Sequence, residues 1–248
     1  LPVTVWSTSG QLLLTKGNPI QSEQHRNRLA EHNASTTYEE GMAWQRAYER
    51  MVHTALRDGI SVDEISKMGM PTDIKAADFV VAQQISGGWP DLQEVLRGIL
   101  YQGGLAINPL ARLTGIEKKA LALLQEDVDD SLFCLFQMLA DSQIGYSATH
   151  ALLCGSICHL TASKLGMSAA HAQLLMFAAM TMNIGMARAQ DSMARQSSDI
   201  TEWQRTLIAE HPARGADILA GFGVDDVDQL DIVRWHHLPD TPEGLPST

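Results

Sequence analysis

The chain has 248 residues, 45% hydrophobic and 19% charged, which is the composition of a globular protein large enough to bury a substantial core. Its net charge of −11 argues against a nonspecific DNA- or RNA-binding surface, because such a surface needs clustered Lys and Arg. Three cysteines are too few for a disulfide framework, and they predict a reducing, cytoplasmic location.

Residues 1–35 are predicted to form a small β-rich unit. Residues 3–6 and 12–14 flank a Ser9-Gly10 turn, which favours a β-hairpin, and a further short strand is expected before residue 20. Ser22 is placed to cap a short helix over residues 23–32.

Residues 36–125 are predicted to be a helical connector packed against the domain that follows. One helix covers residues 39–56 and closes at Asp58-Gly59. Shorter helices follow, and they are interrupted by glycine and proline at Gly69, Pro71, 87–90 and Gly103-Gly104.

Residues 126–248 are predicted to form a second, more hydrophobic helical domain. The aspartates at 127, 129 and 130 favour a helix N-terminus, where negative charge complements the helix dipole. Residues 165–187 include no Lys, Arg, Asp or Glu, but their apolar core of about 10–14 residues is the length of a buried helix and too short for a membrane span. The expected fold class is mainly α, preceded by the β-rich unit.

His150 opens a series of histidines placed on predicted inward faces. It shares a face of the helix 147–165 with Cys154 and Cys158, four and eight residues on. The three side chains could form a soft-metal site, although cysteines acting as small buried hydrophobic residues are the better explanation.

The next histidine, His211, lies on a second predicted helix. Residues 201–204 have the spacing of a capping box, and Leu207 and Ile208 place His211 on an apolar face. Pro212 is predicted to disrupt or restart the helix. A histidine beside such a break either binds a ligand or donates a hydrogen bond to a freed carbonyl.

The adjacent pair His236-His237 ends a third apolar helix and is the strongest local signal in the chain. Ile232 and Val233 lie four residues before them, on the same faces. For each histidine alone, a core or surface role is the better explanation than metal binding, but inward histidines on three helices, His150, His211, His236 and His237, are less easily explained in this way.

In chain order, four segments resemble the HD-GYP phosphodiesterases of the HD superfamily: "YSATHALLCGSICHLTASKLGMS", "FAAMTMNIGMA", "DITEWQRTLIAEHPARGADIL" and "IVRWHHLPDTPEGLP". The resemblance covers roughly residues 127–248. It implies a helical bundle that holds two or three metal ions, often iron or manganese, and cyclic di-GMP as the substrate. It also implies that the four histidines are metal ligands and that the domain continues beyond Thr248, so that this chain is truncated.

The family's His-Asp pair and the lysine that follows it fall on Met182, Asn183 and Met186. The Asn183 amide cannot bridge two cations as an anion, and the Met182 thioether is a poor ligand for the harder ions of such sites. Met186 removes the cation that would hold a phosphate. The Gly-Tyr-Pro signature has become Gly244-Leu245-Pro246, and its preceding Asp falls on Thr241, one residue after Asp240. We therefore expect a domain that has lost the family's catalytic activity but keeps the packing of its helices.

Three hypotheses follow. The first is a catalytically inactive HD-GYP-like signalling domain without a cofactor, which acts by binding cyclic di-GMP or a protein partner such as a diguanylate cyclase, or as a homodimer. The second is a metal-dependent cyclic di-GMP phosphodiesterase with a non-standard iron, manganese or zinc site. That site would be built on His150, His211, His236 and His237, and a residual mononuclear site on His211, His236 and His237 is a separate alternative. The third is an HD-superfamily output domain without metal ligands.

Overall fold

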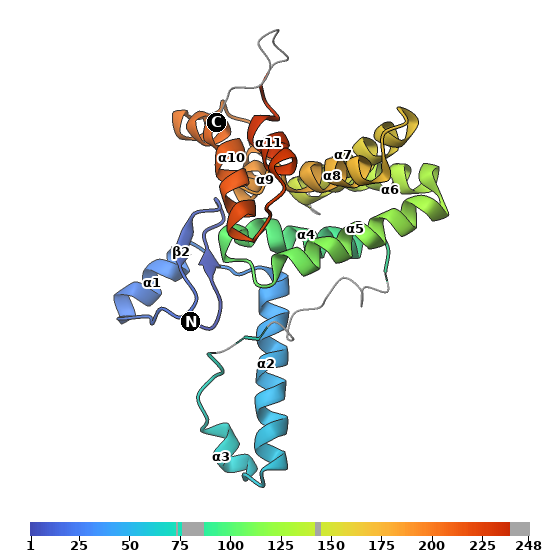
Figure 1. The fold of residues 1–248 in the computed structure, drawn as a ribbon. Coiled ribbons are helices and arrows are strands. Elements are labelled where there is room, and N and C mark those ends of the chain that lie inside the picture. Colours follow the sequence, from blue (N-terminus) through green and yellow to red (C-terminus); the bar gives the residue numbers. More distant parts are fainter. Residues whose placement is uncertain (73, 76–86, 142–144, 239–248) are drawn as a thin grey trace. The chain divides into compact units, whose positions relative to one another are not determined.

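The computed structural model describes residues 1–72, 74–75, 87–141 and 145–238. These residues are 68% helical, in 11 α-helices, and their one sheet has two strands and lies near the N-terminus (Figure 1). The prediction of a mainly α protein with a small β-rich start is therefore confirmed. No helix among the described residues is both long enough and apolar enough to cross a lipid bilayer.

The contacts divide the chain into two compact units, Leu1–Val80 and Val81–Thr248. In the first unit, the predicted hairpin is present as an antiparallel pair of strands, β1 (Val5–Trp6) and β2 (Leu12–Leu14). The further strand expected before residue 20 is not formed, and Trp6 bridges instead to Ser35. The helices of this unit are α1 (Glu23–Glu31), α2 (Tyr38–Arg57) and α3 (Val62–Ser66).

A buried carboxylate joins the hairpin to α2. Glu40 is only 4% exposed; it accepts hydrogen bonds from the Thr4 backbone N–H at 3.1 Å and from the Thr36 hydroxyl at 2.8 Å. Ser22 caps α1, as predicted, and Thr37 caps α2. The hairpin and the first turn of α2 are thus one polar-linked assembly.

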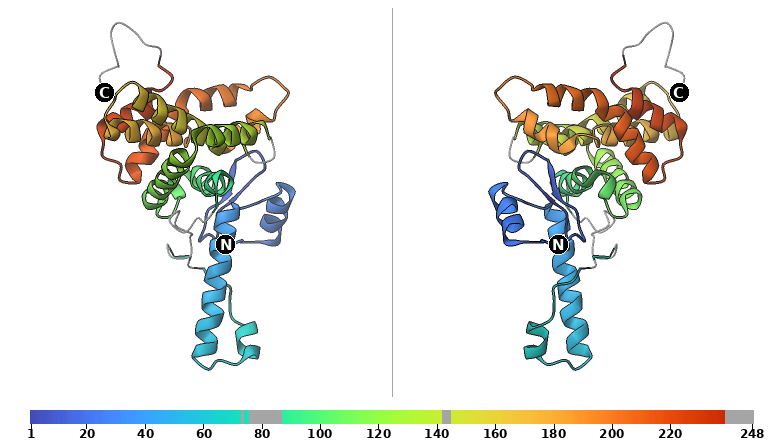
Figure 2. Two further views of the ribbon diagram at one scale, coloured as in Figure 1. Left: turned by 90° about the vertical axis from the view of Figure 1, so that its right-hand side faces the viewer. Right: turned by 90° about the vertical axis from the view of Figure 1, so that its left-hand side faces the viewer.

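The second unit is entirely helical among its described residues. A 3₁₀ turn, Gly103–Leu105, follows its first helix. Its helices are α4 (Trp89–Gln102), α5 (Pro109–Glu126), α6 (Val128–Ala140), α7 (Tyr146–Lys164), α8 (Ala169–Thr181), α9 (Ala187–Ala194), α10 (Glu202–Gly221) and α11 (Val227–Trp235). Figures 1 and 2 show α7 and α8 running beside each other, and these two helices make the most extensive helix–helix contact of the unit.

One hydrophobic core spans α4 to α8 of the second unit. It is built from fully buried side chains that include Leu92, Leu96, Ile99, Leu113, Ile116, Leu135, Leu152, Met176 and Met180. Helices α4 and α5 belong to this core, although the sequence analysis placed them in a connector with boundaries after residues 35 and 125. Apolar periodicity shows that a helix has a buried face, but it does not show which helices share that core.

Asp191 of α9 connects three helices. It is 3% exposed and accepts hydrogen bonds from the backbone N–H and the hydroxyl of Ser147, in the first turn of α7, and from the hydroxyl of Tyr101 of α4. Gly145, the N-cap of α7, has a φ of +105° and provides no capping side chain, so the cap comes from another helix. Burial, reinforced by the Asp191 charge, raises the pKa of Tyr101, which keeps the phenol protonated as a donor.

We predict that Asp191→Ala lowers the free energy of unfolding by about 3 kcal/mol or more, because it leaves buried donors on Ser147 and Tyr101 without an acceptor. Urea unfolding monitored by circular dichroism measures the change. Asp199→Ala removes the same charge from an exposed loop and is the matched control, with an expected change within about 0.5 kcal/mol. Equal effects of the two substitutions would contradict the capping role.

Candidate metal centre

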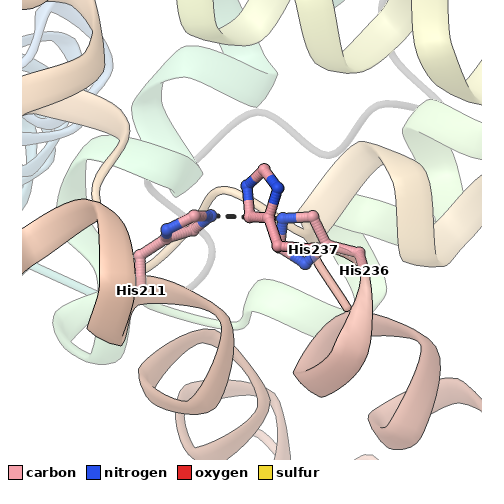
Figure 3. A group of neighbouring side chains, drawn as sticks. All are labelled: His211, His236 and His237. Carbon is pink, nitrogen blue, oxygen red and sulfur yellow. Dashed lines mark hydrogen bonds between the residues drawn. The ribbon is translucent and has the colours of Figure 1, made fainter. Parts of the chain in front are cut away.

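Three of the four histidines singled out in the sequence come together in space. His211 lies in the middle of α10, and His236 and His237 directly follow α11 (Figure 3). One ring nitrogen from each lies within 4.8 Å of the other two. His211 is fully buried, His236 is half-buried and His237 is exposed.

Pro212 fixes the orientation of His211. The sequence predicted a break at Pro212, and this prediction is wrong. Helix α10 is continuous from its Thr201–Gln204 capping box to Gly221, with Pro212 inside it. Proline has no N–H, so the carbonyl four residues earlier, that of Ile208, loses its helical donor. The Nδ1 of His211 lies 2.7 Å from this oxygen and takes the place of the missing amide.

His236 is oriented in the same way by a helix end. The last carbonyls of α11 have no amide donor within the helix, and that of Val233 is one of them. The Nδ1 of His236 lies 2.7 Å from the Val233 oxygen. Val233 itself is fully buried in a small apolar cluster with Ala178, Ala216 and Leu219, which holds α8, α10 and α11 together.

These two hydrogen bonds determine where the lone pairs lie. A carbonyl oxygen only accepts, so each Nδ1 carries the hydrogen and each Nε2 of a neutral ring is left with a lone pair. The two Nε2 atoms are 3.2 Å apart. Two facing lone pairs repel each other unless a proton or a cation lies between them.

The spacing suits a metal ion. With metal–nitrogen bonds of about 2.1 Å, two ligand nitrogens lie about 3.4 Å apart in a tetrahedral site and about 3.0 Å apart at right angles. The separation of 3.2 Å between the His211 and His236 nitrogens falls between these values. The third ring is close to both, because the His237 centroid is 4.3 Å from that of His236 and 5.1 Å from that of His211.

The electrostatics favour neutral rings. The pKa of His211 is lowered to about 4, mainly by burial. The hydrogen bond to Ile208 acts in the opposite direction, and the two neighbouring histidines lower the pKa further. Burial also lowers the pKa of His236. Near neutral pH both rings are therefore unprotonated, which is the form that binds a metal.

The turn at 182–186, which begins with the Met182-Asn183 pair, lies directly against this helix. A Cβ at Gly185 would lie 2.6 Å from the His211 carbonyl oxygen, and one at Gly215 would lie 3.3 Å from the Met182 oxygen. Only glycine permits this approach of two backbones. The turn therefore supports the part of α10 that carries His211.

Met182, Asn183 and Met186 are largely shielded from solvent. Asn183 is 5% and Met186 9% exposed, and Met182 is half-buried. The described histidine group includes no carboxylate. Asp240, Thr241 and the Gly244-Leu245-Pro246 segment lie outside the described residues.

His150 is not a member of the group formed by His211, His236 and His237. Its ring is half-buried, stacks on Tyr146 at 5.2 Å and has Nε2 3.5 Å from the Cys154 sulfur. The core is met by another face of α7, formed by Ala148, Ala151, Leu152 and Gly155.

Sequence reasoning missed the groups that orient the site. The Ile208 carbonyl had a readable signal, because Pro212 stands four residues after it. The close approach at Gly185 and the cap by Asp191 had none, since each depends on a segment distant in the chain.

Comparison of the chain with family models, with curated proteins and with solved structures gives no match. The resemblance to HD-GYP proteins therefore stays a prediction.

We predict that Gly185→Ala destabilises the protein by about 2 kcal/mol, because the new methyl group meets backbone atoms of α10 that have no room to move. Gly221→Ala is the control: no atom lies within 4 Å of its Cβ, and alanine is the better helix former, so stability stays equal or rises slightly. Thermal unfolding of both variants measures the difference. Equal stability of the two would show that the two backbones are not in contact.

We also predict that metal-free protein loses stability as the pH falls from about 6.5 to about 4. Over this range the unfolded chain, with an ordinary histidine pKa of 6.5, binds a proton that folded His211 does not bind. The loss is on the order of 3 kcal/mol in urea titrations. His211→Asn keeps a donor for the Ile208 carbonyl but removes the titrating group, so its pH dependence is shallower. An unchanged pH profile in this variant would contradict the assignment.

Proposed function

We propose that the chain is a non-catalytic, HD-GYP-like regulatory domain whose three clustered histidines hold a single divalent transition-metal ion. One observation carries the proposal: the Nε2 atoms of buried His211 and half-buried His236 face each other at 3.2 Å with their lone pairs, and each ring is fixed by a hydrogen bond from its own Nδ1. The sequence alone favoured a domain without a cofactor. We propose a metal ion instead because of this geometry.

The chemistry of the ligands favours one ion over a catalytic pair. A binuclear hydrolase needs an anionic ligand to bridge its two cations and offset their charge, whereas the described cluster offers three neutral imidazoles. The position that supplies the bridge in the resembled family holds Asn183, which is neutral. Three imidazoles suit zinc, iron(II) or nickel.

The surface supports a protein partner more than a dinucleotide. Met186, at the position of the family's phosphate-binding lysine, is buried and supplies no positive charge. Large apolar side chains are exposed instead: Phe133 is 63%, Phe136 54% and Trp203 61% exposed. Exposed aromatic residues are enriched at protein interfaces. A diguanylate cyclase is the type of partner that the resemblance suggests.

A second candidate function is metal-dependent hydrolysis of cyclic di-GMP. The exposure of His237 favours it, because an ion held there would be reached by solvent. Three histidines with an open coordination position are also the arrangement that activates zinc-bound water.

The metal part of the proposal is tested on protein purified without added metal. We predict one zinc, iron or nickel equivalent per chain by elemental analysis, or its uptake on titration after chelation. His211→Asn and His237→Asn should each weaken binding at least about tenfold, because each removes one of three ligands. His53→Asn, on the exposed side of α2, is the matched control and should bind as the unmodified chain does. Absence of uptake would refute the metal site.

The catalytic part is tested by incubating the metal-loaded protein with cyclic di-GMP. We expect neither turnover nor a linear dinucleotide product. Turnover that His211→Asn abolishes would contradict the proposal and establish the second candidate instead.

A further inference from the structure

A separate pocket lies between α8 and α11, beside the histidine cluster. It has a volume of about 560 Å³, within the range of small-molecule sites. Its lining is mainly apolar, from Met167, Leu174, Leu175, Ile232, Trp235 and Leu238. Its polar groups are the two imidazoles of His171 and His236 and the carboxylates of Asp228 and Asp231.

Within the described part of the chain, the two carboxylates are not neutralised by an ion pair: neither Asp228 nor Asp231 forms one. Asp228 lies in the first turn of α11, where the helix dipole accounts for its charge. Asp231 is half-buried in the middle of the helix, where the dipole gives no such support.

The arginine nearest to Asp231 in the chain pairs elsewhere. Arg234 lies three residues after Asp231, a spacing at which the two side chains could form an ion pair. Its guanidinium instead donates to the Asp217 carboxylate of α10, at 3.0 Å. The pocket therefore keeps a negative charge at its apolar wall.

Trp235 adds an attraction for cations. Its indole ring lines the pocket, and the face of an indole attracts cations.

We propose that this pocket binds a small organic cation: a molecule with an apolar body and a protonated amine or guanidine. The apolar wall takes up the body, the Asp231 carboxylate pairs with the cationic nitrogen, and Asp228 adds long-range attraction. The same charges exclude anionic ligands, including nucleotides and carboxylic acids, from this pocket. This proposal does not rest on a bound metal, although His236 borders both sites.

Three probes of matched size test the charge preference: phenylbutylamine, phenylbutanol and phenylbutyrate. Binding to the full chain is measured by ligand-observed NMR and calorimetry after chelation of any metal, so that coordination to the histidine cluster makes no contribution. We expect the amine to bind most tightly, the alcohol about tenfold more weakly and the carboxylate not detectably.

Asp231→Asn should weaken binding of the amine about tenfold and leave binding of the alcohol unchanged. Asp199→Asn, an equal change of charge outside the pocket, is the control and should alter neither. Met167→Trp fills the pocket from a position that is 41% exposed, and it should abolish binding of both amine and alcohol without disturbing the core. Equal binding of amine and carboxylate, no binding of the amine, or an unchanged affinity in Asp231→Asn would each overturn the proposal.

Discussion

The candidate site depends on one repeated interaction, the hydrogen bond from a histidine Nδ1 to a carbonyl that the helix cannot satisfy. Pro212 frees the Ile208 carbonyl inside α10, and the end of α11 frees the Val233 carbonyl. Each ring is thereby held in one orientation and one tautomer. The two Nε2 atoms face each other as a direct result, because the outward nitrogen of each ring has no other direction to take.

The surrounding structure keeps the two helices at the distance this pairing needs. Gly185 and Gly215 let the turn at 182–186 and α10 meet backbone to backbone, and a small apolar cluster that includes Val233 joins α10 to α11 and α8. Helix α9 follows the same turn and carries Asp191, whose carboxylate caps α7. The segment from 182 to 191 therefore has both packing and capping roles.

The histidine group includes no carboxylate among the described residues. An ion held by three imidazoles alone would keep its full positive charge, unlike the ions of a carboxylate-bridged pair. The neighbouring pocket has a different lining, with two carboxylates on an apolar wall. Both proposed ligands are cations, a metal ion at the histidines and an organic cation in the pocket, and His236 borders both sites.

The sequence by itself determined most of the helices and some of their caps, and it singled out three histidines that the fold brings together. The spacing of apolar residues, the capping residues and the glycine positions are local properties of the sequence. They therefore predicted α2, α10, the caps at Ser22 and Thr201, and the inward face of His211. The tertiary structure decided the rest: the exclusion of His150, the shared core of α4 to α8, the cap by Asp191 and the 3.2 Å approach of two imidazoles. These depend on contacts between residues far apart in the chain, which no local pattern records.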